Sequence, residues 1–232
     1  THFIALESLG ARVSAEKQGF SVRAGKMEGA CIFLDEPSVT ATENALMASA
    51  LAPGATRIKN AASEPHVQDL IGFLNTLGAR ISGTGSNILS IEGVRSLKGG
   101  GWRIANDHIE VGSFISLAAV TGSELTIRNA EVRHLDMILL CFSKLGVRVE
   151  IDGEDLIVPG DQKLVVRNDH FGETPTVYDA PWPGFPTDLT SIAVVTATQS
   201  SGTILVFEKM FDGRLFFVDK LASMGARIVL CD

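Results

Sequence analysis

A short string that recurs four times constrains the fold of this chain more than any other feature. Copies of LGAR, or close variants of it, begin at Leu9, Leu77, Leu145 and Met224. The first three copies are spaced 68 residues apart, and the last follows after 79. Each copy ends a segment with the apolar period of a helix, and its glycine stands where a left-handed residue would end that helix. The residues that follow, as in 79–93 and 147–160, predict β-hairpins.

A second pattern alternates with the first and completes a repeating unit. Residues 40–61, 109–130 and 188–209 each predict an Ala-rich helix, a turn containing glycine and then a strand. The unit is therefore hairpin, helix, strand, helix, in about three copies along the chain. Because the Ala-rich helices have no clear polar face, we expect sheets that enclose buried helices. GTGSN at 83–87 lies between two predicted strands, which indicates a hairpin turn rather than a phosphate loop.

Composition and charge exclude several classes of protein. The 232 residues are 45% hydrophobic and carry a net charge of -7, which argues against a nucleic-acid binder. No apolar run approaches the roughly 18 residues of a membrane span, and no secretory signal is evident. Cys31, Cys141 and Cys231 lie in apolar runs, which predicts reduced core thiols in a cytoplasmic protein. The five histidines are scattered without metal-ligand spacing, so no metal site is predicted.

The ends of the repeats predict a piece of a longer protein. The chain begins at Thr1 inside the first helical pattern and stops just after MGARIVLC, before the returning hairpin strand of the other copies. A strand without its partner leaves unpaired backbone groups at an edge. KGGGW at 98–102 is the best internal boundary, because glycine runs carry no packing.

The third repeat differs from the others by an insertion. Eleven or twelve extra residues fall within 167–188, which also holds four of the prolines and the only tyrosine. A rigid loop inserted in one copy, at a helix start, is a candidate functional loop, the alternative being a plain surface loop. Asp188 ends this loop, where a carboxylate is well placed to act as a general base or to accept a hydrogen bond from a hydroxyl.

The starts of the Ala-rich helices are further candidates. Helix N-termini offer free N–H groups that suit phosphate or carboxylate. Helix capping by Ser38, Thr40 and Thr187 is the equally weighted alternative, and capping is also the default for Asp107 and Glu110. Arg214, in a loop after a predicted strand, could pair with an anionic ligand or be an ordinary surface residue.

Several strings carry a family resemblance over essentially the whole chain. They include DEPSVTATENALMASALA (35–52), NDHIEVGSF (106–114), PGFPTDLTS (183–191) and EKMFDGRLFFVDKLASMGA (208–226). The chain resembles the enolpyruvyl transferases that act on UDP-N-acetylglucosamine in peptidoglycan synthesis. The resemblance implies an α/β fold with two partial domains, at 1–105 and 106–232, each part of an inside-out α/β barrel of repeated units. It places the active site between those domains.

The resemblance also assigns roles to residues. It gives Asp188 the part of catalytic base that contacts the acceptor hydroxyl. It places substrate contacts at Pro37, Ser38, Val39, Thr40, Met210 and Arg214, with Glu64, Asp107 and Glu110 as secondary candidates. The chain departs from the family pattern at Thr40, where glycine is usual, at Glu36, and at His108 in place of arginine.

The implied reaction moves the enolpyruvyl group of phosphoenolpyruvate to the 3′-hydroxyl of UDP-N-acetylglucosamine and releases phosphate. No metal or organic cofactor is implied, because positioning and acid–base chemistry suffice. The family's catalytic loop and further arginines would lie outside this chain, so we expect the isolated chain to be inactive. Two alternatives stay open: a different acceptor, such as shikimate 3-phosphate, and a non-catalytic module that binds nucleotide sugar.

Overall fold

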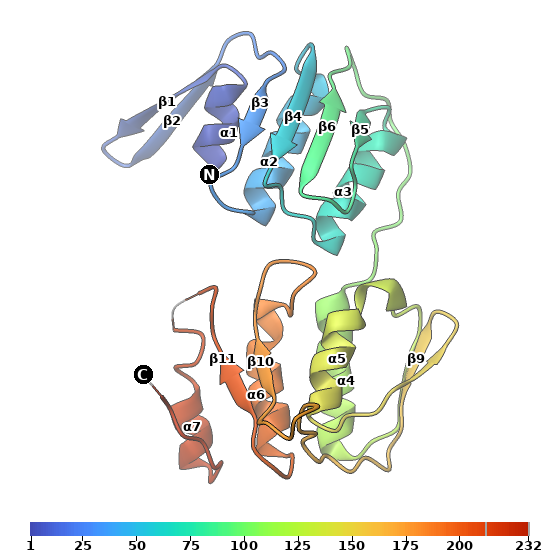
Figure 1. The fold of residues 1–232 in the computed structure, drawn as a ribbon. Coiled ribbons are helices and arrows are strands. Elements are labelled where there is room, and N and C mark those ends of the chain that lie inside the picture. Colours follow the sequence, from blue (N-terminus) through green and yellow to red (C-terminus); the bar gives the residue numbers. More distant parts are fainter. Residues whose placement is uncertain (212, 232) are drawn as a thin grey trace. The chain divides into compact units, whose positions relative to one another are not determined.

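The chain folds into two compact units (Figure 1). The computed structural model describes residues 1–211 and 213–231. Unit 1 spans Thr1–Ala105 and unit 2 spans Asn106–Asp232. No helix among the described residues is long and apolar enough to cross a membrane.

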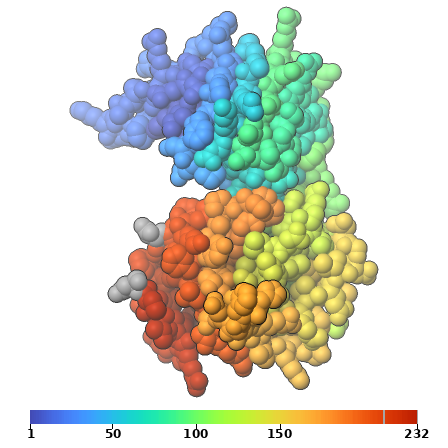
Figure 2. Space-filling view, viewed as in Figure 1, coloured from blue at the N-terminus to red at the C-terminus, as the bar shows by residue number. Residues whose placement is uncertain are grey.

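Unit 1 alternates helices with short strands. In chain order its elements are α1 (His2–Ser8), β1 (Ala11–Glu16), β2 (Gly19–Ala24), β3 (Cys31–Phe33), α2 (Val39–Leu51), β4 (Ala55–Lys59), α3 (Pro65–Thr76), β5 (Arg80–Ser82) and β6 (Ile88–Glu92). The strands β3, β4, β6 and β5 form one sheet in that order, in which only β3 and β4 run parallel. The antiparallel pair β1–β2 forms a separate hairpin, which projects from the rest of the unit (Figure 2).

The core of unit 1 lies between this sheet and helices α2 and α3. Strand alternation points Ile32, Ile58, Leu89 and Ile91 inward, and each is at most 1% exposed. On α2, Ala41, Ala45, Leu46 and Ala50 are fully buried. The small alanines allow α2 to contact both α1 and α3 as well as β4 and β6. The predicted burial of the Ala-rich helix is confirmed here.

Unit 2 repeats the same plan with two extra short 3₁₀ turns. Its elements are α4 (His108–Thr121), β7 (Leu125–Ile127), η1 (Val132–His134), α5 (Asp136–Lys144), β8 (Glu150–Asp152), β9 (Asp155–Val158), β10 (Thr176–Tyr178), η2 (Thr187–Leu189), α6 (Thr190–Thr198), β11 (Leu205–Phe207) and α7 (Val218–Ser223). The strands β7, β9 and β8 form an antiparallel sheet, while β10 and β11 form a parallel pair. The Ala-rich helices α4 and α6 pack together, and Ser116 and Thr196 share a 2.6 Å hydrogen bond between them.

The hairpins predicted after the first three LGAR-type strings and the predicted helices are confirmed, but residues 226–231, after the fourth string, form no strand. The hairpins β5–β6 and β8–β9 lie where the pattern placed them, and GTGSN forms the turn of the first. The sequence pattern missed β3 and β10, the short strands that precede α2 and η2. Each pairs in parallel with the strand that follows its Ala-rich helix, β4 or β11. Two of the copies therefore begin with a short strand before the Ala-rich helix, whereas no described strand lies directly before α4.

The glycines of the LGAR-type strings end their helices as predicted. Gly10, Gly78, Gly146 and Gly225 all have φ between 85° and 102°. Gly146 also lies against the backbone of Val165, where an added Cβ would come within 2.4 Å of the amide nitrogen. Glycine is required there both for the left-handed backbone and for the close approach.

The prediction that all three cysteines lie in the core is wrong for two of them. Cys141 is buried on α5, but Cys31 and Cys231 are exposed. On β3 the alternation of side chains buries Ile32, so its neighbour Cys31 faces outward. Cys231 lies beyond α7, outside any helix or strand.

Candidate functional site

The part of the inserted loop that follows β10 folds back onto the end of that strand. It leaves β10 at Asp179, passes through Trp182 and returns at Phe185, which bridges to Asp179 and accepts a 3.1 Å hydrogen bond from the Ala180 amide. The Phe185 side chain is 1% exposed and packs edge-on against Phe142. Burial of this ring anchors the loop, so the residues that follow it enter η2 at a fixed position.

Asp188 lies on η2 and pairs with Arg214. The distance from Asp188 Oδ1 to Arg214 Nη1 is 3.2 Å, and the two side chains are 65% and 44% exposed. The Arg214 backbone N–H donates a 2.7 Å hydrogen bond to Glu208 Oε1, and its guanidinium lies 5.3 Å from the Phe211 ring centroid. The structure therefore brings two predicted site residues together at the solvent-facing surface of unit 2, where both can meet a ligand.

Met210 lies close to the same place. Its Sδ atom is 3.4 Å from Thr187 Oγ1, the residue before Asp188. The expectation that Thr187 caps the helix is wrong, because its hydroxyl donates to Asp179 Oδ2 at 2.9 Å and Pro186 takes the cap position. Asp179 is fully buried, and its Oδ1 accepts a 2.6 Å hydrogen bond from the Lys209 amide.

Asp179 was missed by sequence reasoning. No pattern separates it from the other acidic residues of the inserted loop, such as Asp169, whose carboxylate accepts from the nearby amides of Phe171 and Glu173. The available signal was position, because Asp179 directly follows a short β-prone run, TVY. That signal has value only once the run is known to be a strand.

The start of α2 holds the predicted contacts of unit 1. Pro37, Ser38 and Val39 are half-buried, and Ser38 is the N-cap, its Oγ accepting from the Ala41 amide at 3.4 Å. Thr42 donates to the Ser38 carbonyl at 2.8 Å and accepts from the Ala62 amide at 2.9 Å. Thr42 thus fixes the start of α2 against the segment that leads into α3.

Thr40 does not cap the helix. It is exposed on the first turn of α2, and its hydroxyl lies 3.2 Å from His2 Nε2. The other ring nitrogen of His2 lies 2.9 Å from Asn44 Nδ2, one turn further along α2. The Thr40 hydroxyl therefore contacts the first residue of α1, at the same helix start as Ser38.

The three secondary candidates fall in different settings. Glu64 precedes α3, and its Oε2 is buried without a partner among the described residues. Asp107 is exposed and caps α4, accepting from the Ile109 amide at 2.8 Å, which confirms the capping interpretation. Glu110 is exposed in the first turn of α4.

His108 is buried against the inserted loop. Its ring meets the Trp182 ring edge-on at 5.7 Å, and His134 meets the same ring at the same distance. Burial, with a smaller effect of Arg133, lowers the pKa of His134 from its usual value of 6.5. His108 and His134 therefore contribute to packing of the loop on α4 and η1.

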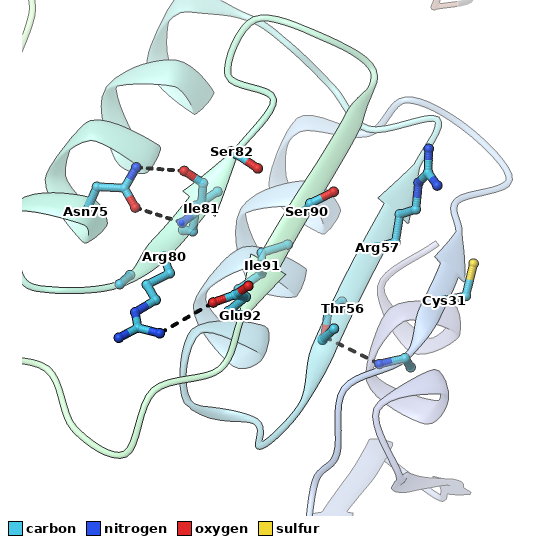
Figure 3. Close-up of a pocket in the computed structure, with 13 residues that line it drawn as sticks. Cys31, Thr56, Arg57, Asn75, Arg80, Ile81, Ser82, Ser90, Ile91 and Glu92 are labelled. Atoms are coloured by element: carbon cyan, nitrogen blue, oxygen red, sulfur yellow. Dashed lines mark hydrogen bonds and ion pairs between the residues drawn. The ribbon is translucent and has the colours of Figure 1, made fainter.

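A hollow of about 740 Å³ lies on the four-stranded sheet of unit 1 (Figure 3). Its lining comes from β3, β4, β6, β5 and the end of α3, and includes Arg57 and an Arg80–Glu92 ion pair of 3.4 Å. None of the predicted site residues lines it. The predicted site residues lie elsewhere, at the start of α2 in unit 1 and, separately, around Asp188 in unit 2.

Comparison with known proteins identifies the family. The family model for EPSP synthase (3-phosphoshikimate 1-carboxyvinyltransferase) matches residues 1–231. The chain belongs to the EPSP synthase family. Among curated relatives, two proteins named UDP-N-acetylglucosamine 1-carboxyvinyltransferase match over all 232 residues: that of Treponema denticola at 58% identity and that of Bradyrhizobium diazoefficiens at 57%. The chain spans about half of their length, 54% of each.

Solved structures of the EPSP synthase family share the fold. The enolpyruvyl transferase NikO from Streptomyces tendae superposes with a TM-score of 0.84 at 20% identity, covering 100% of this chain and 56% of that one. EPSP synthase from Acinetobacter baumannii gives a TM-score of 0.67 at 18% identity, covering 97% and 52%. The chain therefore has the enolpyruvyl transferase fold. Its described strands form separate small sheets that do not close into a barrel.

Proposed function

We propose that the full-length protein containing this chain transfers the enolpyruvyl group of phosphoenolpyruvate to the 3′-hydroxyl of UDP-N-acetylglucosamine. The observation that carries the proposal is the 57–58% identity, over the entire chain, to curated proteins whose name states this carboxyvinyl transfer. The pairing of Asp188 with Arg214 supports it, since it places a carboxylate and a cation side by side on an exposed surface.

The reaction requires proton transfers at the methylene carbon of phosphoenolpyruvate and at the acceptor hydroxyl. A proton adds to the methylene carbon while the acceptor oxygen attacks the adjacent carbon and gives up its own proton to a base. The tetrahedral intermediate then loses phosphate, and a methyl proton leaves to restore the vinyl group. We assign Asp188 to the acceptor hydroxyl, because a carboxylate can take that proton.

The remaining predicted residues bind and orient the substrates. The Met210 backbone and Arg214 would hold the nucleotide sugar near Asp188, because an arginine suits a diphosphate. Pro37–Thr40 would contribute from the start of α2, with Glu64, Asp107 and Glu110 in secondary roles. We propose that each unit is part of one of two domains, and that residues beyond this chain complete the active site. Consequently we expect no turnover from the isolated chain.

We also propose that the protein acts in the cytoplasm without a nucleic-acid or membrane partner. The net charge of -7 opposes binding to polyanions. The substrates themselves are anionic, so local cations such as Arg214 must compensate for the overall charge at the site.

The test is phosphate release by the full-length protein with phosphoenolpyruvate and one acceptor at a time. Release with UDP-N-acetylglucosamine and none with shikimate 3-phosphate is the expected result. Release with shikimate 3-phosphate alone would replace the proposed acceptor. Tight binding of the nucleotide sugar without any phosphate release would favour a non-catalytic binding module.

A further inference from the structure

A buried carboxylate joins the two segments that carry the unit 2 site residues. Asp179 follows β10 directly, and Lys209 comes shortly after β11, the parallel partner of β10 (Figure 1). Because parallel strands end at the same edge of a sheet, the chain positions after β10 and β11 lie close together. The Asp179 carboxylate occupies this place and is 0% exposed.

Each oxygen of Asp179 binds the neighbour of a different site residue. Oδ1 accepts the Lys209 amide at 2.6 Å, and Lys209 precedes Met210. Oδ2 accepts the Thr187 hydroxyl at 2.9 Å, and Thr187 precedes Asp188. A buried carboxylate is tolerated only when its oxygens are hydrogen-bonded, so this arrangement favours a single geometry.

We propose that Asp179 is a positioning residue that holds Asp188 in register with Met210 and Arg214. This inference rests on the proposed function. Asp179 would touch no substrate, yet it would set the position of the reacting carboxylate of Asp188. Displacement of a reacting group by about 1 Å can lower a rate about 100-fold, so such a tether controls turnover.

The side-chain chemistry at position 179 predicts which variants lose kcat and which keep it. Asp179→Asn keeps one oxygen for the Lys209 amide, and its NH₂ can donate to Thr187 Oγ1, so both links persist. Asp179→Ala removes both links, and Thr187→Val removes only the link to the Asp188 loop. A matched control is Asp169→Ala, since the Asp169 carboxylate lies in the same inserted loop and also accepts two backbone amides, but only those of Phe171 and Glu173.

The experiment measures kcat and KM in the full-length protein, with the active fraction determined by titration. Asp179→Ala should lower kcat about 10- to 100-fold, Thr187→Val by less, and Asp179→Asn and Asp169→Ala should stay near wild type. In an Asp188→Asn background, Asp179→Ala should cause no further loss, because the tether acts through Asp188. An equal loss in both backgrounds, or a wild-type kcat for Asp179→Ala, would overturn the proposal.

A second readout does not depend on catalysis. Hydrogen exchange at the Lys209 amide should be faster in Asp179→Ala than in the wild type and unchanged in Asp169→Ala. If the wild-type protein transfers no enolpyruvyl group, the proposed function fails while this readout still tests the tether. Unchanged exchange at Lys209 would show that Asp179 does not hold that segment.

Discussion

Asp188 and Arg214 lie 26 positions apart in the sequence, yet Oδ1 of the first is 3.2 Å from Nη1 of the second. The two residues reach this distance because Asp188 follows the inserted loop and Arg214 follows β11, and both segments leave the same edge of the β10–β11 pair. An ion pair this exposed adds little stability, since solvent screens it. We therefore propose that its value is functional, because it places a carboxylate beside a cation that an anionic substrate can recruit.

The first prediction concerns that carboxylate. In the full-length protein, Asp188→Asn should lower kcat at least about 100-fold, because the amide cannot accept a proton from the acceptor hydroxyl. The Kd for UDP-N-acetylglucosamine should change much less, since the side chain keeps its shape. Steady-state kinetics and calorimetric titration measure the two quantities. A variant with normal kcat would remove Asp188 from the chemistry.

Arg214→Gln should act mainly on binding. Loss of the guanidinium removes a cation from the place where the nucleotide diphosphate is expected, so the KM for the nucleotide sugar should rise by about tenfold or more. The dependence of this KM on salt concentration should weaken at the same time. Arg133→Gln, at an exposed arginine paired with Glu131, is the matched control and should leave KM unchanged. An unaltered KM in Arg214→Gln would contradict its assignment.

Backbone geometry predicts a stability difference between two glycines of unit 2. Both Gly146 and Gly153 have positive φ, 85° and 62°, so alanine at either should cost about 1–2 kcal/mol. Only at Gly146 would the new Cβ also overlap a backbone, that of Val165, while Gly153 has open space around it. Gly146→Ala should therefore lower the free energy of unfolding by about a further 1–3 kcal/mol. Denaturant unfolding measures this, and equal losses would refute it.

The thiols should differ sharply in reactivity. Burial raises the pKa of Cys141 to about 11, only partly offset by Lys144, so little thiolate forms there at about pH 8. Cys31 and Cys231 are exposed. A thiol reagent should modify these two quickly and Cys141 only after unfolding. Cys141→Ser should leave the fast phase intact, whereas Cys31→Ser should reduce it; fast labelling of Cys141 would contradict the burial.

His134 should make stability depend on pH. Its pKa is lowered by burial and by Arg133, so below the unfolded value of about 6.5 the unfolded chain binds the proton more readily. The stabilisation is present above that pH and is lost as the pH falls through the lower folded value. His134→Gln should flatten the decline of the unfolding free energy on acidification. An unchanged decline would show that other groups cause it.

The sequence predicted the recurring parts of this molecule better than its local exceptions. Apolar period and glycine position located α3, α5 and the two hairpins, because these signals lie within each segment. The strands β3 and β10 are only three residues long, and three residues show too little alternation to be recognised. Their strand form depends on pairing with β4 and β11, which is a long-range contact.

The same distinction holds at the candidate site. Asp188 and Arg214 were proposed from the inserted loop and from a family resemblance, and the structure brings them together. The partner of Thr187 could not be foreseen, since the hydroxyl was equally suited to capping the helix. Asp179 is recognisable only from the hydrogen bonds that its carboxylate accepts. The Lys209 amide, distant in sequence, donates at 2.6 Å, and the Thr187 hydroxyl, at the other end of the loop, donates at 2.9 Å.

The most direct test of the proposed reaction is to identify its product. The full-length protein is incubated with phosphoenolpyruvate and UDP-N-acetylglucosamine, and the nucleotide sugar is analysed by mass spectrometry and NMR. We expect an enolpyruvyl ether at the 3′-oxygen, with one phosphate released for each ether formed. Unmodified nucleotide sugar, in a protein shown to be folded and able to bind it, would contradict the proposed reaction.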